Sequence, residues 1–420
     1  MNGSCVFKFS LFVRLFVIIL QVIFNRCVPD HNADAFRLPY EKGVGVSNTI
    51  VSYFLEGFSR WDAQYFLHIS LYGYTHENTL AFFPFFPMLL RNSSKILSVI
   101  FPFSLSPLNC ALLSGVLLNS ILASLSTVAL YKLTKRVFQS EIFAFTSALL
   151  FCINPASIFF SALYSESFFS LLTFSSLWAL ERGWFFIGLC GLGYQIYCYL
   201  LFCTSVVPEK ELPEIVANFL VRNDLKVPSE PSKWCFWNIP LSYSYVQARY
   251  WDVGFLHYFS IKQIPNFVLA APVIIIILLS CVKYFIKHRR ELWHLGLIEN
   301  KVYDTSDVYS NTKCFPYFIH MFLATVFCIL FIHIQVVTRM LCSSSPILYW
   351  VAAAALLPAN DRARFKLLKE HSQKNWLFDS LLFIKKIFLK SSIQGKIIFC
   401  YFVAYFLIGT FLHVNFFPWT

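Results

Sequence analysis

Long apolar runs separated by short polar segments make up most of the chain. The first runs from Phe9 to Phe24, and the others cover residues 80–100, 108–130, 143–160, 168–180, 184–206, 267–285, 315–337, 346–357 and 397–417. Runs of this length are typical of helices that cross a hydrocarbon layer about 30 Å thick. Some of them are short or contain proline, so we expect fewer crossings than runs. The pattern predicts an all-α polytopic membrane protein with about nine transmembrane helices.

Composition supports this class. The chain is 57% hydrophobic and 13% charged, and its formal net charge is +12. In a soluble protein such a charge would suggest nucleic acid or an acidic partner, but here the bases stand in blocks beside apolar runs, as expected of cytosolic loops. We therefore interpret the positive charge as a mark of the cytosolic loops of a membrane protein, and we expect no nucleic-acid partner. Phe9–Phe24 lacks a small-residue cleavage site, which favours a retained signal-anchor.

Three basic blocks set the expected orientation. They are Lys132 with Lys135 and Arg136, then Lys283 to Arg290, and finally the loop 360–395. Placing them in the cytosol puts the segment 25–79, the large loop 208–266 and residues 338–345 on the opposite, lumenal side.

One inconsistency follows from this orientation. If 80–100 and 108–130 both crossed, the Lys132 block would lie on the same side as Asp62. We expect one of them to be broken or re-entrant, which suits Pro84 and Pro87.

The cysteines give a weaker signal. Most of the 13 lie inside apolar runs, where a thiol behaves as a small hydrophobic group. Only Cys27 and Cys235 fall in segments placed on the lumenal side, where they could form a disulfide or stay free. With no CxxC pair or histidine-rich cluster, we expect no metal site.

The segment Arg60-Trp61-Asp62 places a carboxylate shortly before the apolar stretch Ala81–Pro87. Charge is scarce in this chain, so such a carboxylate needs a reason. In an aromatic, half-buried setting beside a cation such as Arg60, Asp62 could act as a general base near neutral pH. The structural alternative is an aspartate that caps a helix in an interfacial loop.

A second carboxylate follows a proline-broken helix. Pro155 interrupts an apolar run directly after Asn154, and Tyr164 and Glu166 follow on the side expected for Asp62. Two carboxylates from separate loops could bracket one site. Alternatively, Asn154 satisfies carbonyls freed by the proline and Glu166 marks a helix end.

Two further segments combine aromatic, amide and cationic side chains. In the large loop, Ile239–Gln247, Tyr250–Phe255 and Lys262–Phe267 could offer aromatic platforms to sugar rings and cations to phosphate, or could simply form an aromatic belt. In His333–Arg339, an ionisable pair at the end of a membrane helix suits a phosphate head group, unless Arg339 merely snorkels to the interface.

These segments define the candidate site. We expect catalytic roles for Asp62 and Glu166. The expected substrate-binding residues are Arg60, Trp61, Asn154, Tyr164, Gln247, Arg249, Trp251, Lys262, Gln263, His333, Gln335 and Arg339.

Taken together, the segments resemble the PIG-V family of GPI mannosyltransferases. The matching stretches keep one order over most of the chain: 60–69, 81–87, 154–167, 239–272, 333–339, 343–350 and 415–420. No mechanism follows from the last stretch, Asn415–Thr420.

The resemblance implies a GT-C-type fold in the endoplasmic reticulum membrane, with lumenal loops forming the active site. It implies dolichyl-phosphate mannose as the donor, no cofactor, and transfer of a second, α1,6-linked mannose to the GPI glycolipid precursor. Inversion at the sugar requires a carboxylate that deprotonates the acceptor hydroxyl, and Asp62 matches the acidic residue of that loop. His333, Arg339, Arg249 and Lys262 are candidates to hold the phosphate, and Glu166 is a supporting group.

The chain departs from the family after Glu181-Arg182-Gly183. Family members carry further apolar helix there, whereas residues 184–206 lead almost directly to Pro208. An even number of spans is therefore missing. Besides an active enzyme, the sequence allows a catalytically silent membrane subunit or a truncated isoform. A small membrane subunit is a further candidate partner, while a transporter would need repeats that the sequence lacks.

Overall fold

The computed structural model describes residues 3–40, 43–101, 105–181, 189–204, 212–228, 232–237, 240–294, 307–358 and 375–419. Over these residues the protein is helical and contains no β-strand. The α-helices are α1 (Gly3–Cys27), α2 (Val46–Leu55), α3 (Ala63–Tyr72), α4 (Phe85–Ile100), α5 (Pro107–Phe138), α6 (Glu141–Cys152), α7 (Glu166–Leu180), α8 (Leu189–Cys203), α9 (Glu214–Arg222), α10 (Ser242–Trp251), α11 (Ile264–Lys287), α12 (Arg289–Trp293), α13 (Phe315–Phe331), α14 (Ile334–Ser344), α15 (Ile347–Leu356), α17 (Trp376–Lys390) and α18 (Ile393–Val414).

Short 3₁₀ helices complete the described chain. The ones that matter for the site are η2 (Glu77–Ala81), η3 (Ser157–Phe160) and η4 (Lys233–Phe236). Parts of five predicted segments lie outside the described residues. These parts are 41–42 of the segment 25–79, both ends of the run 184–206, residues 208–211, 229–231 and 238–239 of the large loop, much of the basic loop 360–395, and Thr420.

Five described helices are long and apolar enough to cross a membrane: α1, α5, α11, α13 and α18. Two shorter apolar helices, α6 and α15, lie among them. The prediction of an all-α polytopic membrane protein is therefore confirmed. The figure of about nine crossings stays a prediction, because length and composition alone identify these helices.

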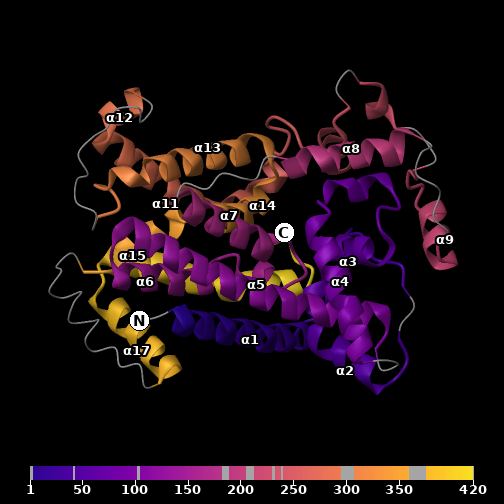
Figure 1. The fold of residues 1–420 in the computed structure, drawn as a ribbon, viewed down its shortest axis with the longest axis horizontal. Helices are drawn as coiled ribbons and strands as arrows, with labels where there is room; N and C mark the ends of the chain where they lie inside the picture. The colour runs from indigo at the N-terminus through magenta and orange to yellow at the C-terminus, as the bar shows by residue number, and fades with distance from the viewer. Residues whose placement is uncertain are drawn as a thin grey trace.

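The short helix α4 is consistent with the broken or re-entrant segment that the predicted orientation requires, which stays a prediction. The chain forms η2 before Pro84, and α4 then runs for only 16 residues and carries Arg91 and Lys95. It is not among the candidate spans. Since α5 has 32 residues and is therefore about 48 Å long, its basic end is far from its start. Figure 1 shows α2, α3 and α4 at one end of the long axis, and α12 and α17 at the other.

The centre of the bundle is α5, which packs against α1, α4, α6 and α7. At Gly115 a Cβ atom would lie 2.9 Å from side-chain atoms of both Leu90 and Leu163, so the absence of a side chain permits this close approach. One turn along, the Asn119 amide donates to the carbonyls of Ala162 and Tyr164. The segment after η3 is thereby fixed to α5.

A buried arginine in α1 repairs the helix that Pro155 breaks. The Arg14 side chain donates to the carbonyl oxygens of Cys152 (2.5 Å) and Ser157 (2.8 Å) and to the Ser157 hydroxyl (2.6 Å). Asn154 contributes locally, since its amide donates to the Phe151 carbonyl at 2.8 Å. Its side chain is buried, so the structure favours the structural alternative for Asn154 over substrate binding.

We expect Arg14→Leu to destabilise the protein. The substitution leaves the carbonyls of Cys152 and Ser157 without these donors, and each unsatisfied buried group costs about 1–3 kcal/mol. The thermal midpoint of purified protein should fall, and Lys8→Leu, which removes an exposed cation from the same helix, is the control. Equal midpoints for the two variants would contradict this role.

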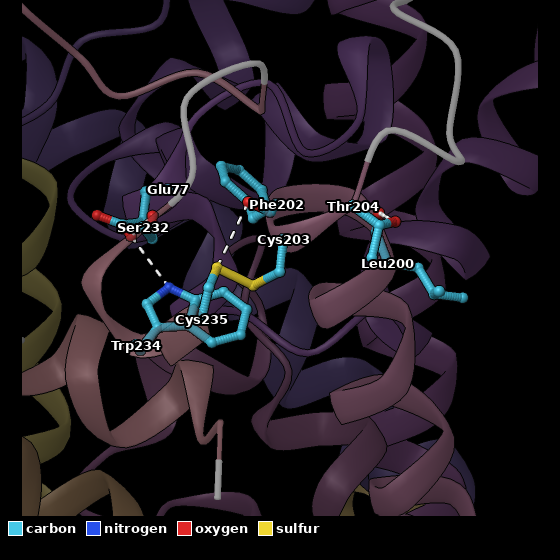
Figure 2. Close-up of a disulfide and its surroundings, with 8 residues drawn as sticks. All are labelled: Glu77, Leu200, Phe202, Cys203, Thr204, Ser232, Trp234 and Cys235. Atoms are coloured by element: carbon cyan, nitrogen blue, oxygen red, sulfur yellow. Dashed lines mark hydrogen bonds between the residues drawn. A yellow bond between two sulfur atoms is a disulfide. The ribbon is translucent and has the colours of Figure 1, made fainter. Parts of the chain in front are cut away.

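The structure contains a disulfide other than the Cys27–Cys235 pairing that the sequence left open. Cys203 and Cys235 are bonded, with Cα atoms 5.4 Å apart (Figure 2). Cys27 is free and exposed. The sequence counted Cys203 inside an apolar run, but it is the last residue of α8, where the helix meets the large loop. Cys27, in contrast, ends α1 in another part of the fold. The Cys27–Cys235 pairing is therefore wrong.

Peptide mapping after alkylation under non-reducing conditions should recover Cys203 linked to Cys235. Cys27 should carry the alkyl group, because it is exposed and unpaired. Cys27→Ser should leave the linked peptide intact, while Cys203→Ser should abolish it. A linked peptide containing Cys27 would refute the assignment.

Candidate functional site

Asp62 lies at the start of α3, immediately after a left-handed turn at Trp61, whose φ is 56°. It occupies the capping position, yet its side chain accepts no capping hydrogen bond. Instead Asp62 Oδ2 accepts a hydrogen bond from Arg339 at 2.7 Å. The capping alternative therefore does not describe this carboxylate.

Arg339 joins the two predicted carboxylates. It lies on α14, and besides Asp62 it pairs with Glu166 Oε1 on α7, 3.4 Å from its Nε. The exposed fractions of the side chains are 12% for Arg339, 12% for Glu166 and 23% for Asp62. Asp62 is thus the member of this Asp62–Arg339–Glu166 cluster most open to a substrate. Because Arg339 is 12% exposed and pairs with two carboxylates, it does not simply extend to the membrane interface, as snorkelling would require.

Two aromatic rings support the guanidinium. Its carbon lies 5.1 Å from the centre of the Tyr164 ring and 5.4 Å from that of Phe159, within the range of cation–π contacts. The Tyr164 hydroxyl donates to the Arg60 carbonyl at 3.3 Å, so the ring also contacts the segment that carries Asp62. Phe159 was not predicted as a site residue.

The electrostatics divide the roles of the three ionisable groups. Burial favours loss of the Arg339 proton, but the carboxylates of Asp62 and Glu166 outweigh it and raise the arginine's pKa. Burial also raises the pKa of Glu166, and Arg339 offsets part of that rise. A fixed positive charge therefore lies beside one partly exposed and one buried carboxylate. Glu166 Oε2 has no hydrogen-bond partner among the described residues.

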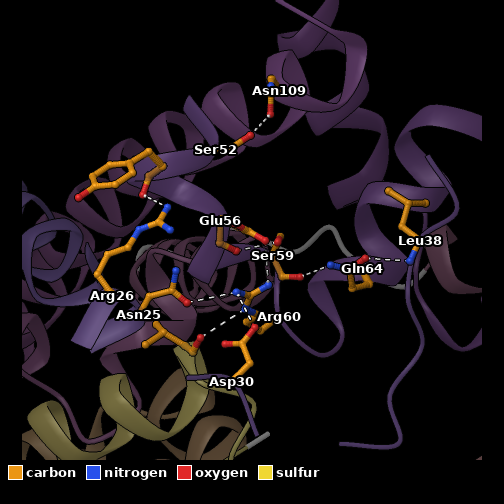
Figure 3. A network of polar contacts seen from close by, with 12 residues as sticks. Asn25, Arg26, Asp30, Leu38, Ser52, Glu56, Ser59, Arg60, Gln64 and Asn109 are labelled. Carbon is orange, nitrogen blue, oxygen red and sulfur yellow. Dashed lines mark hydrogen bonds and ion pairs between the residues drawn. The ribbon is translucent and has the colours of Figure 1, made fainter. Parts of the chain in front are cut away.

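Arg60 does not pair with Asp62, contrary to the sequence-based expectation. Its guanidinium pairs with Asp30 at 3.0 Å and Glu56 at 3.5 Å, and donates to Asn25 (Figure 3). The left-handed turn at Trp61 separates the two side chains. Arg60 is thus a structural anchor of the first loop.

The segment 414–419, which the sequence left without a role, supports the same loop. Arg60 Nε donates to the Val414 carbonyl at 3.3 Å, and the Phe416 ring lies 4.8 Å from its guanidinium carbon. Phe416 also meets the Trp61 ring edge-on at 5.7 Å. Trp61 is therefore packed by the tail, although its buried indole nitrogen has no partner among the described residues.

The predicted residues of the large loop divide into two groups. Trp251 contacts Tyr65 on α3 and therefore lies next to the turn that carries Asp62. Gln247 shares α10 with it and is half-buried, whereas Arg249 is exposed and donates to the Tyr245 hydroxyl at 2.8 Å.

Of the other predicted residues, Gln263 in the large loop and His333 before α14 both contact Tyr258. Gln263 accepts a hydrogen bond from the Tyr258 hydroxyl, and the His333 ring lies 4.6 Å from the Tyr258 ring. Gln335 lines a small hollow with Thr338 and Trp419, one turn from Arg339, and Lys262 is exposed. Among the described residues, neither Arg249 nor Lys262 pairs with Asp62 or Glu166.

Within the described ranges, no group of three or more histidine, cysteine, aspartate or glutamate side chains could hold a metal ion. Metal independence stays a prediction. Sequence reasoning missed the contacts of Arg14 and Phe159. The scarcity of charge could have drawn attention to Arg14, but nothing distinguished Phe159 from the other phenylalanines.

The long apolar helices and the partly buried cluster of Asp62, Arg339 and Glu166 define a membrane-embedded protein whose charged groups are suited to catalysis. The profile of the family described as mannosyltransferase (PIG-V) matches residues 3–194 and 184–420. The chain belongs to this family and is a glycosyltransferase. No solved structure matches it.

Curated relatives resemble the chain over nearly its whole length. The GPI alpha-1,6-mannosyltransferase 2 of Mus musculus is 34% identical, and the Homo sapiens protein of that name is 33% identical; both alignments cover 99% of this chain and 98% of the relative. The GPI mannosyltransferase 2 of Drosophila melanogaster is 29% identical over 98% of this chain and 99% of its own length.

The alignments also bear on the shortened region. The one with the mouse protein extends over 484 residues, more than the 420 of this chain, so the relative has residues that this chain lacks. The two profile matches meet at residues 184–194.

Two buried histidines, His68 and His76, follow Asp62 in the first loop, and burial lowers the pKa of both. His68 on α3 and His76 both hydrogen bond to the Thr75 hydroxyl, at 2.7 and 2.8 Å, and both rings are buried. Burial lowers the pKa of His68 to about 4. Burial, followed by the neighbouring His68, lowers the pKa of His76 well below its usual value.

These shifts predict a loss of stability in mild acid. In the unfolded chain these histidines bind protons below about pH 6.5, whereas in the folded protein they stay neutral to a lower pH. The stability that comes from burying them as neutral rings is therefore complete above pH 6.5 and is lost as the pH falls toward 4. The thermal midpoint should drop by a few degrees over this interval, and less in a His68→Asn, His76→Gln double variant. Parallel profiles would show that neither histidine is responsible.

Proposed function

We propose that this protein transfers a mannose from dolichyl-phosphate mannose to a GPI-anchor precursor, as the second, α1,6-linked mannose, in the lumen of the endoplasmic reticulum. The observation that carries the proposal is the Asp62–Arg339–Glu166 cluster in a PIG-V family member whose relatives bear GPI mannosyltransferase names. Positive-inside placement of the basic blocks supports the lumenal side for Asp62.

The cluster suggests how the reaction proceeds. A donor phosphate attracts the Arg339 guanidinium, which weakens its pairing with Asp62 and leaves that carboxylate to act as base. The acceptor hydroxyl attacks the anomeric carbon and loses its proton to Asp62. As the new carbon–oxygen bond forms, the bond to the phosphate oxygen breaks and dolichyl phosphate leaves with the electron pair. Attack opposite the leaving group inverts the sugar configuration.

In this mechanism Glu166 is a positioning residue. It keeps Arg339 over the Tyr164 ring after Asp62 is released, because its Oε1 remains 3.4 Å from the arginine. The phosphate is a good leaving group and requires no general acid. Tyr65 is stacked between Phe36 and Phe82, so we assign the half-buried Trp251 ring beside it to the acceptor sugars.

A second candidate, a catalytically silent membrane subunit, draws on one observation. The chain is shorter than its alignments with the relatives, and the profile match divides where further membrane helix was expected. If a wall of the lipid groove is absent, the cluster would persist without turnover. A partner subunit could in either case accompany the chain.

The decisive experiment uses cells that lack the second GPI mannosyltransferase. Expression of this chain should restore GPI-anchored proteins at the surface, measured by flow cytometry. Asp62→Asn should reduce transfer in membrane extracts by about 100-fold or more, as expected when a general base is lost. Asp224→Asn removes an exposed loop carboxylate and is the matched control.

The two candidates give opposite outcomes. An enzyme requires rescue by the natural sequence and its loss with Asp62→Asn at equal protein amounts. A silent subunit predicts that neither chain restores surface expression and that both co-purify with the same partner. Rescue by Asp62→Asn would remove the base from the mechanism.

A further inference from the structure

A second buried carboxylate lies outside the Asp62–Arg339–Glu166 cluster. Glu77 begins η2 in the first loop, and its residue is fully buried. Oε1 accepts hydrogen bonds from the Ser232 hydroxyl and, at 3.1 Å, from the Trp234 indole (Figure 2). Oε2 accepts one from the Tyr250 hydroxyl at 2.7 Å. All three donors belong to the large loop, more than 150 residues away.

A small apolar core adjoins these donors. Its buried members are Leu80, Cys198, Phe202, Trp234 and Val246. Burying a carboxylate is costly unless its oxygens accept strong hydrogen bonds. Here three neutral donors compensate that cost. An apolar residue could fill the same space without binding these donors. A carboxylate, in contrast, fixes the positions of Ser232, Trp234 and Tyr250 relative to the first loop.

The geometry leads back to Asp62. Tyr250 precedes Trp251, whose ring lies 5.8 Å from Tyr65 and 5.9 Å from Phe82. Tyr65 is on α3, and its backbone N–H donates to the Asp62 carbonyl at 3.0 Å. Burial and then the Glu77 bond raise the pKa of Tyr250, which keeps the phenol protonated as a donor.

Two further contacts tie the large loop to the segment around Glu77. Glu77 N donates to the Lys226 carbonyl at 2.9 Å, and Cys235, next to Trp234, is bonded to Cys203 at the end of α8. Three parts of the large loop therefore converge on the first loop at this residue. Of these parts, α10 places a ring directly against α3, through the contact of Trp251 with Tyr65.

We propose that Glu77 is a positioning residue for the acceptor: by fixing Tyr250, it holds the Trp251 edge of α10 at a set distance from Asp62. This inference rests on the proposed function. Arg339 takes the donor phosphate in that mechanism, so we assign the Trp251 ring, which contacts Tyr65 on α3, to the mannose-bearing acceptor glycolipid. Glu77 itself touches no substrate.

The test separates acceptor binding from turnover. Wild type and Glu77→Gln are assayed in membranes with dolichyl-phosphate mannose and a synthetic mannosylated glycolipid acceptor, each varied in turn. An amide loses the charge-assisted bonds, which are about twice as strong as neutral ones. We expect KM for the acceptor to rise roughly three- to tenfold, while kcat and the KM for the donor change less than about twofold.

Two controls distinguish positioning from general damage. Glu214→Gln, an exposed glutamate on α9 in the same loop, should behave as wild type. Recovery of the linked Cys203–Cys235 peptide from Glu77→Gln shows that the neighbouring fold has formed. Tyr250→Phe, which removes one donor and keeps the ring, should also raise the acceptor KM. In the double variant the rise in acceptor KM should be smaller than the product of the rises in the two single variants.

The outcomes are distinct. Unchanged acceptor KM in both Glu77→Gln and Tyr250→Phe, with an active wild type, overturns this inference and leaves the proposed function standing. A loss confined to kcat or to protein amount also overturns it, since that would indicate a purely structural carboxylate. An inactive wild-type chain overturns the proposed function, and this inference with it.

Discussion

The structure depends on how an apolar chain compensates for the few charges it buries. Arg339 is the clearest case, because its guanidinium joins helices α3, α7 and α14 through Asp62, Glu166 and two aromatic rings. Taking one partner away would leave a charge in a poorly solvated place, so the groups hold one another in position. A protein organised in this way has its functional charges and its tertiary contacts in the same few residues.

The same rule explains the architecture around the site. Arg14 satisfies carbonyls freed by a broken helix, and Glu77 gathers donors from a distant loop. Each charge joins segments that the sequence separates widely. The aromatic rings between them provide a surface suited both to cations and to sugars. In the proposed reaction, the loops that contact the substrates are held in place by these buried polar contacts, and the long apolar helices support the loops.

Sequence patterns predicted the class and the position of most long helices. They also singled out Asp62, Glu166 and Arg339, which the fold brings into contact, because scarce charges are visible in an apolar sequence. They did not predict which charges pair. Arg60 is adjacent to Asp62 in sequence yet turns away, because Trp61 adopts a left-handed conformation that periodicity does not reveal. Cys203 was taken for a core thiol because a helix end cannot be located to one residue. Partners more than 200 residues apart, such as Asp62 and Arg339, required the fold.

The contacts of α1 change how this helix should be regarded. Its Arg14 binds Ser157 in η3, and η3 carries Phe159, one of the two rings beneath Arg339. Helix α1 is thus a support for the segment beneath Arg339, besides being long and apolar enough to cross a membrane. Exchanging it for an unrelated apolar helix of equal length would keep that length and remove the donors that hold η3 in place.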